Sequence, residues 1–160
     1  MASQLPSFPR TVFTIVEPVS LIAGCLGPII NTDWFIASQT NNNNLLSSLS
    51  PSDDNARLVA QQLGNAYGLL FLVGVAVLYT TTEIKVVRNY LVALLIADIT
   101  HVSLTIHALG YERTVDVAAW NPVTWGNIGF TVFLGLTRTA YLLGLFGSAE
   151  KGKMPAKKVL

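Results

Sequence analysis

The chain has 160 residues and a mass of 17.3 kDa, the size of a single domain. Hydrophobic residues make up 51% and charged residues only 12%, with a mean hydropathy of +0.50. Soluble domains carry about 25% charged residues, so the composition excludes an ordinary soluble globular protein. The net charge of +1 gives no excess of basic residues that would bind a nucleic acid. The single cysteine, Cys25, excludes a disulfide framework and a Cys-based zinc site.

Four long apolar stretches follow one another along the chain, at residues 12–30, 58–82, 86–109 and 125–146. Each is long enough to cross a hydrocarbon layer of about 30 Å as a helix, and none has the strict alternation of a barrel strand. The stretches are joined by a polar segment at residues 31–55, a tight hairpin at Glu83-Ile84-Lys85, and residues 110–124, which carry interfacial aromatic side chains. We therefore expect an all-α fold, an integral membrane four-helix bundle with a polar interior, in a single domain that spans residues 1–160.

The distribution of basic residues predicts the orientation of these spans. With four spans, the N-terminus, the turn near residue 84 and the C-terminal tail at 147–160 lie on one side. That side holds seven basic residues, Arg10, Lys85, Arg88, Lys151, Lys153, Lys157 and Lys158, and the other side holds two, Arg57 and Arg113. The positive-inside rule then places both termini in the cytosol.

The last four residues match the dilysine pattern K-K-x-x, with Lys157 and Lys158 as the pair. This pattern resembles the cytosolic retrieval signal of membrane proteins of the endoplasmic reticulum, which is an address read by a receptor. The alternative is a solvated basic tail. The cytosolic position that the positive-inside rule gives this tail favours the retrieval signal, and with it the endoplasmic reticulum membrane as the location.

Five ionisable side chains fall inside the predicted spans: Glu17, Asp98, His101, His107 and Arg138. Such groups are costly in a bilayer and mark functional sites by default. Helical spacing places Asp98 and His101 on one face of the third span, with Tyr90 on the same stripe. We expect Glu17, Asp98 and Arg138 to bracket one cavity and His107 to lie at the membrane boundary.

Polar side chains on the other stripes complete the predicted site. Asn127, Arg138 and Tyr141 share a face of the fourth span, and Asn65 lies on the predicted inner face of the second, with Gln61, Leu72 and Tyr79. We expect Asn65, Tyr90, Tyr141 and Asn127 to bind substrate or water. The small residues Gly24, Gly27 and Gly68 are expected to permit close helix packing.

Two carboxylates in different environments can hold opposite protonation states and act as acid and base. Glu17 has apolar neighbours in the sequence, and Asp98 has Arg138 and His101 within reach. We therefore expect Glu17 to be the general acid and Asp98 the base, with Arg138 and His101 setting the charge state of Asp98. The reverse assignment stays open, and so does a purely structural ion pair between Asp98 and Arg138.

The size, the span spacing, the Glu17-Pro18 pair in the first span and Asp98 in a later span give the chain a resemblance that covers residues 12–146. It resembles small fungal membrane proteins of secondary metabolism, namely terpene cyclases of meroterpenoid pathways and epoxide hydrolases of polyene-pyrone pathways. The resemblance implies a cofactor-independent epoxide hydrolase or cyclase in which a membrane carboxylic acid protonates the epoxide of a lipophilic polyene or terpenoid.

The sequence leaves hydrolysis and cyclisation open, together with a different class of function, a non-enzymatic lipid-binding, sterol-binding or assembly protein. It contains no signature of soluble catalytic or nucleotide-binding motifs. We expect no metal and no cofactor. The expected partners are the lipid bilayer and a lipophilic small molecule, with no nucleic acid, and the sequence does not decide whether the chain forms a homo-oligomer.

Overall fold

The computed structural model describes residues 5–40 and 53–147, and over these residues the chain is predominantly helical, without strands. The Asn-rich tract at 41–44 and the C-terminal dilysine both lie outside the described residues. Three helices are long and apolar enough to cross a membrane, Ser7–Ile30, Asp54–Thr80 and Ile84–Leu109, when the described residues are searched. The all-α prediction is therefore confirmed, and three of the predicted spans coincide with helices that could cross a membrane by length and composition.

The first long helix is continuous but changes its pitch just before Glu17. It consists of α1 (Ser7–Thr11), a π-helical stretch at Val12–Val16, and α2 (Glu17–Ile30). Because Pro18 has no N–H, the carbonyl of Thr14 loses its usual α-helical donor. That carbonyl instead accepts a hydrogen bond from the hydroxyl of Tyr79 at 2.7 Å, which ties the segment ahead of Glu17 to the neighbouring helix.

A short helix, α3 (Thr32–Ser38), follows at once. Asn31 interrupts the first helix with an extended φ of −141°, and its side-chain oxygen accepts from the Trp34 N–H at 3.2 Å. This is the N-cap arrangement that Asn favours. The predicted polar joint at 31–55 thus begins with a helix that carries two adjacent aromatic residues, Trp34 and Phe35.

Helices α5 (Asp54–Thr80) and α6 (Ile84–Leu109) are the longest elements. The chain turns between them through extended residues at Thr81 and Glu83. The turn predicted at Glu83-Ile84-Lys85 therefore lies slightly earlier in the chain, because Ile84 and Lys85 already belong to α6. α6 ends at Gly110, whose φ of 76° lies in the left-handed region that favours glycine.

The remaining helices form the connection and the last long stretch. Two short elements, α7 (Tyr111–Val115) and a 3-10 turn at Val117–Ala119, precede α8 (Pro122–Thr124), a π-helical stretch at Trp125–Phe130, and α9 (Thr131–Leu142). Asn121 caps α8, since its side-chain oxygen accepts from the Thr124 N–H at 2.9 Å. The predicted fourth span, 125–146, therefore corresponds to a helical stretch at 122–142 with a pitch change, and it is not among the three helices long and apolar enough to cross a membrane in the described residues.

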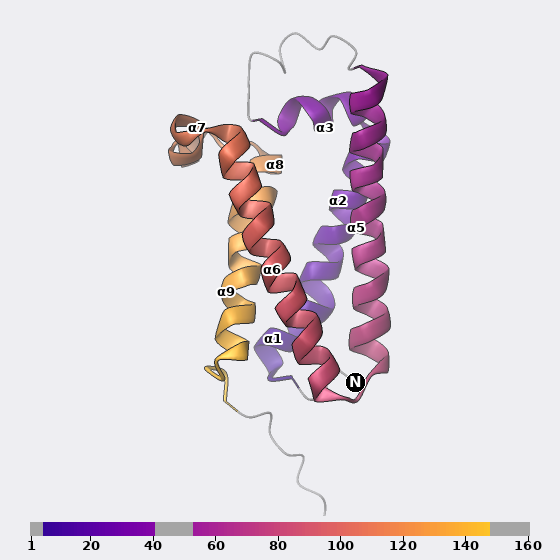
Figure 1. Cartoon of the computed structure of the whole chain (residues 1–160), viewed down its shortest axis with the longest axis vertical. Coiled ribbons are helices and arrows are strands. Elements are labelled where there is room, and N and C mark those ends of the chain that lie inside the picture. The colour runs from indigo at the N-terminus through magenta and orange to yellow at the C-terminus, as the bar shows by residue number, and fades with distance from the viewer. Residues whose placement is uncertain (1–4, 41–52, 148–160) are drawn as a thin grey trace, which may run out of the picture.

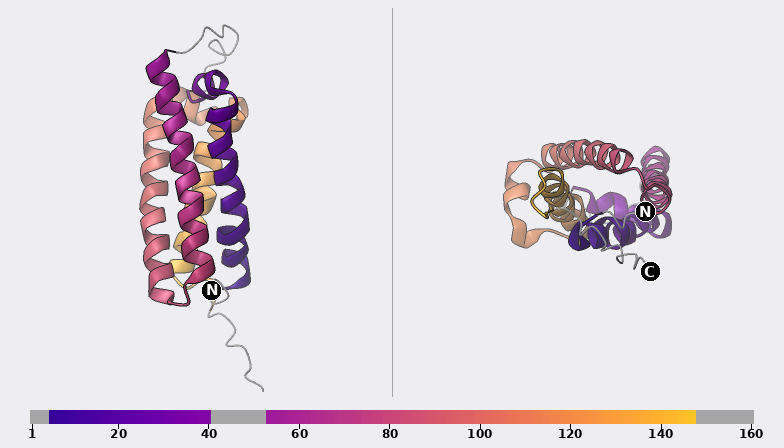
Figure 2. Two further views of the ribbon diagram at one scale, coloured as in Figure 1. Left: turned by 90° about the vertical axis from the view of Figure 1, so that its right-hand side faces the viewer. Right: turned by 90° about the horizontal axis from the view of Figure 1, so that it is seen from below.

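The helices are arranged as two pairs (Figures 1 and 2). α5 lies along α2, and α6 lies along α9. α1 and the turn between α5 and α6 lie at one end of the molecule, and α3 and α7 lie at the other (Figure 1). Small residues let the first pair approach closely, because a Cβ added at Gly64 would lie only 2.7 Å from Pro28 Cγ and 2.9 Å from the Cys25 carbonyl oxygen.

Buried and exposed apolar residues are distributed as expected for a bundle in lipid. A cluster of buried side chains gathers near the α1 end, formed by Leu5, Val12, Phe13, Leu78, Val87, Leu91, Leu134 and Tyr141. Large apolar side chains on the outer faces are more than half exposed, among them Val59, Leu69, Leu72, Ile96, Ile99 and Leu104. Since extended exposed apolar patches are rare on soluble monomers, these exposed side chains are consistent with helices that face lipid, as the hydrophobic composition of the chain predicts.

Candidate active site

Arg138 of α9 lies between two carboxylates that come from two other helices. Its Nη2 pairs with Glu17 Oε1 at the start of α2, and its Nη1 pairs with Asp98 Oδ2 on α6. The side chain of Arg138 is 1% exposed, that of Glu17 8% and that of Asp98 13%. The Phe13 ring packs on the guanidinium, with its centroid 5.5 Å from Cζ. The three charged residues that the sequence predicts to bracket a cavity are therefore in direct contact.

The charges of this cluster do not balance. With Glu17, Asp98 and Arg138 all ionised, two negative charges face one positive charge. An uncompensated charge is expensive in a buried site, so the cluster gains by holding one proton. A carboxyl that holds a proton and a carboxylate that accepts one are the two groups that acid–base catalysis needs.

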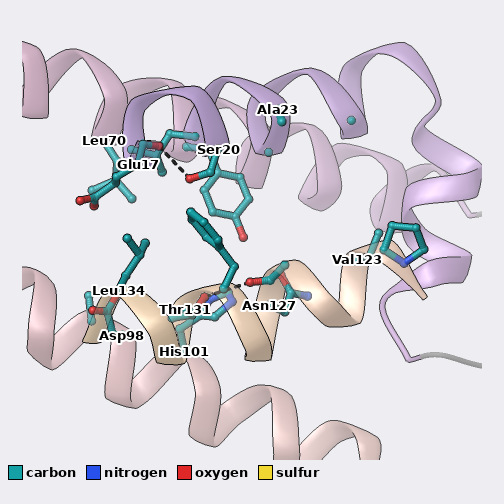
Figure 3. Close-up of a pocket in the computed structure, with 18 of the residues that line it drawn as sticks. Glu17, Ser20, Ala23, Leu70, Asp98, His101, Val123, Asn127, Thr131 and Leu134 are labelled. Carbon is teal, nitrogen blue, oxygen red and sulfur yellow. Dashed lines mark hydrogen bonds between the residues drawn. The ribbon is translucent and has the colours of Figure 1, made fainter. Parts of the chain in front are cut away.

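A cavity of about 460 Å³ opens beside the cluster and runs between the two helix pairs. Glu17, Asp98 and Leu134 lie at one end, His101 and Asn127 lie farther along, and Val123 lies toward the other end (Figure 3). Most of the lining is apolar. The volume falls within the range of small-molecule sites, which are largely apolar pockets with a few polar groups.

The polar groups in the middle of the cavity form a chain of hydrogen bonds. The His101 ring bonds to the side chain of Asn127 (Figure 3), and the Asn127 Nδ2 donates to Gln39 Oε1 at 3.1 Å. Nearer the cluster, the Ser20 hydroxyl donates to the backbone carbonyl of Glu17 at 2.7 Å (Figure 3). The bonds through Asn127 fix the orientation of His101, whose ring lies on the cavity wall.

Three predicted substrate-binding residues do not line the cavity. Asn65 is exposed on α5. Tyr141 is buried in the apolar cluster near α1, and Tyr90 packs against that cluster. The fourth, Asn127, lines the cavity as described above.

The displacement of Asn65 reflects how α5 is rotated about its axis. The buried positions on α5 are Ala60, Gly64, Gly74 and Leu78, and the predicted stripe of Gln61, Asn65, Leu72 and Tyr79 is exposed. The close packing of Gly64 on α2, and not the polarity of the side chains, therefore determines which face of α5 is buried.

Several residues that line the cavity were not among the site residues predicted from the sequence. Tyr67 and Leu70 reach the cavity from α5, and Trp34 and Phe35 reach it from α3. The one signal available for α3 is the aromatic pair Trp34-Phe35 inside an otherwise polar joint. Among the residues that the structure describes, no group of three or more His, Cys, Asp or Glu side chains is placed to hold a metal ion.

Comparison with known families gives one match. The model of a family described as a domain of unknown function, DUF7704, matches residues 2–148, which is nearly the whole chain. No curated protein and no solved structure matches significantly.

Proposed function

The chain belongs to the DUF7704 family, and we propose that it is a membrane-embedded enzyme that opens an epoxide of a lipophilic polyene or terpenoid. The observation that carries the proposal is the pair of carboxylates, Glu17 and Asp98, that share one buried arginine at the polar end of an apolar cavity. An epoxide needs a proton on its oxygen and a base for the incoming nucleophile, and this cluster supplies both without a cofactor.

In the proposed mechanism, Glu17 holds the proton of the cluster and donates it to the epoxide oxygen as the ring C–O bond breaks. Water, or a hydroxyl of the substrate, attacks the carbon, and Asp98 takes the proton that this nucleophile loses. Transfer of that proton back to Glu17 restores the enzyme. The product is a diol when water attacks and a cyclic ether when an internal hydroxyl attacks, so atoms and charges balance in both cases.

The other groups position the reaction. Arg138 holds both carboxylates by its two Nη atoms, which sets the distance between acid and base. His101 faces the cavity one helical turn beyond Asp98 and is held by Asn127. In the proposal it orients the attacking oxygen.

Resemblance to the small fungal membrane cyclases and epoxide hydrolases supports the same reaction. It rests on the Glu17-Pro18 pair and on Asp98 in a later helix. Pro18 has a structural consequence here, because it frees the Thr14 carbonyl for the Tyr79 hydroxyl and so anchors the segment that carries Glu17.

We further propose that four helices cross the membrane of the endoplasmic reticulum, with the helical stretch at 122–142 as the fourth span and both termini in the cytosol. The support is the seven-to-two distribution of basic residues, together with α1 and the α5–α6 turn lying at the same end of the molecule.

A glycosylation reporter fused after Leu160 is expected to stay unmodified, and its glycosylation would overturn the orientation. Replacing Lys157 and Lys158 by Ser is expected to release the protein from the endoplasmic reticulum.

The test of the enzyme proposal is turnover by purified protein in lipid nanodiscs, with lipophilic epoxides as substrates and diol or cyclic ether as the measured product. Glu17→Gln and Asp98→Asn are each expected to lower turnover by at least about 10²-fold, the usual contribution of a positioned proton-transfer group. Glu83→Gln and Asp53→Asn are the matched controls, since both residues are exposed. Near-full turnover by both cavity variants would place the site elsewhere.

A second candidate is a non-enzymatic lipid- or sterol-binding protein, which the mostly apolar cavity lining favours. It is distinguished by the same experiment. Binding of lipophilic probes without any product, unchanged by Glu17→Gln, supports the binding protein and contradicts the enzyme.

A further inference from the structure

The cavity extends well beyond the ionic cluster. On α2 its lining runs from Glu17 through Ser20 and Gly24 to Gly27, a rise of about 15 Å at 1.5 Å per residue. The opposite wall runs from Leu134 back to Val123. The cavity is therefore elongated along the helices, with its charged groups at one end only.

Aromatic residues of α3 line the other end. Trp34 and Phe35 belong to the lining, and the Phe35 ring lies 3.4 Å from where a Cβ at Gly27 would stand. Phe35 is buried. The apolar path that begins at Glu17 thus meets two large side chains at its far end.

Polar contacts fix α3 in this position from two sides. The Asn121 Nδ2 donates to the Ser38 carbonyl at 3.0 Å, and the Arg113 Nη1 donates to the Thr40 carbonyl at 2.8 Å. On the other side, Asp33 pairs with Arg57 of α5. An end wall tied both to α5 and to the segment that connects α6 with α9 is a fixed stop for a chain in the cavity.

We propose that this cavity selects its substrate by length. The substrate is a single-chain lipophile with its oxygen function at one end, which lies against Glu17 and Asp98, and with its chain ending at Trp34 and Phe35. This inference rests on the proposed function for the reacting group, and on the shape of the cavity for the chain. It identifies α3 as the determinant of the longest chain that the enzyme accepts.

The experiment measures turnover of the terminal epoxides of octane, dodecane and octadecane by the full-length protein in nanodiscs. A chain of about 15 Å corresponds most closely to the dodecane compound, so we expect the highest kcat/KM there. Octadecane epoxide is expected to react at least about tenfold more slowly, since even one methylene too many in an apolar pocket costs roughly 10–200-fold. A sterol epoxide is the counter-probe, and its turnover at the rate of the dodecane compound would contradict a single-chain substrate.

Two variants, one in the α3 end wall and one in the side wall that faces α2, then move the limit in opposite directions. Trp34→Ala is expected to raise turnover of octadecane epoxide at least about tenfold. Gly126→Leu is expected to shift the optimum to octane epoxide, because nothing lies within 4 Å of a Cβ at this lining residue. Trp125→Ala, outside the lining, is the control and should leave the profile unchanged. A variant that fails to fold loses all three substrates together, which differs from a shift.

A binding readout separates this inference from the proposed function. The primary alcohols of the same three chains raise the Tm of the protein when they bind the native state. If no epoxide is converted but the alcohols show the dodecane optimum and the Trp34→Ala shift, the enzyme proposal fails and the length selection stands. Equal turnover and equal Tm shifts for all three lengths, in wild type and both variants, would overturn the length selection.

Discussion

The two ends of the cavity are built from different kinds of interaction. At one end, Glu17 and Asp98 converge on Arg138, and all three side chains are almost fully buried. At the other end, α3 and the residues just after it are held by hydrogen bonds to backbone carbonyls, from Asn121 to Ser38 and from Arg113 to Thr40, and by the partly exposed pair of Asp33 and Arg57.

The charged end of the cavity carries the proposed acid–base chemistry, and the α3 end carries the proposed selection of substrate length. Charges that are buried together hold each other's positions tightly, because loss of one leaves another without a partner. Neutral and partly solvated contacts are individually weaker, so the α3 end can be altered without disturbing the acid and base. The comparison predicts large effects at the charged end and small effects at the α3 end.

The largest effect is expected for Arg138→Met, which leaves two buried carboxylates without their cation. We expect a loss of about 3–5 kcal/mol in the free energy of unfolding, measured by denaturant titration in detergent micelles. Arg10→Met, at an exposed position, is the control and should change stability by less than about 0.5 kcal/mol.

The same cluster allows a rescue test. Adding Glu17→Gln and Asp98→Asn to Arg138→Met removes the uncompensated charges, so the triple variant is expected to be more stable than Arg138→Met alone. Strictly additive losses would mean that the three side chains do not interact, contrary to the structure.

An intermediate effect is expected for Asn127→Leu, which is similar in size but removes the partner of both His101 and Gln39. Both side chains are half-buried, so the loss should stay below the about 1–3 kcal/mol that fully buried polar groups lose without a partner, and thermal unfolding should shift accordingly. Turnover should also fall, because the His101 ring loses its orientation. Wild-type turnover in this variant would remove His101 from the proposed mechanism.

The smallest effect is expected for Arg57→Gln. Its side chain is 38% exposed and that of Asp33 is 31% exposed, so the pair is worth roughly 0–1 kcal/mol. The length profile for the three epoxides should persist, since the hydrogen bonds to α7 and α8 still hold α3. A loss as large as that of Arg138→Met would mean that the two ends of the cavity do not differ in the way described.

The hydropathy pattern predicts much of the fold. The stretches at 58–82 and 86–109 correspond to α5 and α6 within a few residues, because apolar length is a strong signal. Hydropathy does not report the π-helical turns before Glu17 and at Trp125–Phe130, since these depend on local hydrogen bonding. It also leaves α3 unrecognised inside a polar joint.

The charged part of the site follows from helical spacing, and the rest does not. Glu17, Asp98 and Arg138 meet as the spacing predicts, because an unpaired charge is costly in a buried site and is stabilised by an opposite charge. Asn65 lies outside the site, since α5 turns Gly64 toward α2 for close packing. Polarity alone does not reveal which of two competing faces packs best.

The most direct test of the account is the turnover of a lipophilic epoxide by Glu17→Gln and Asp98→Asn, with Glu83→Gln beside them in the same nanodiscs. Both cavity variants are expected to remain folded and to lose at least about 10²-fold in kcat, and Glu83→Gln is expected to match the wild type. Folded Glu17→Gln and Asp98→Asn proteins that both convert the epoxide at the wild-type rate would contradict the proposed mechanism.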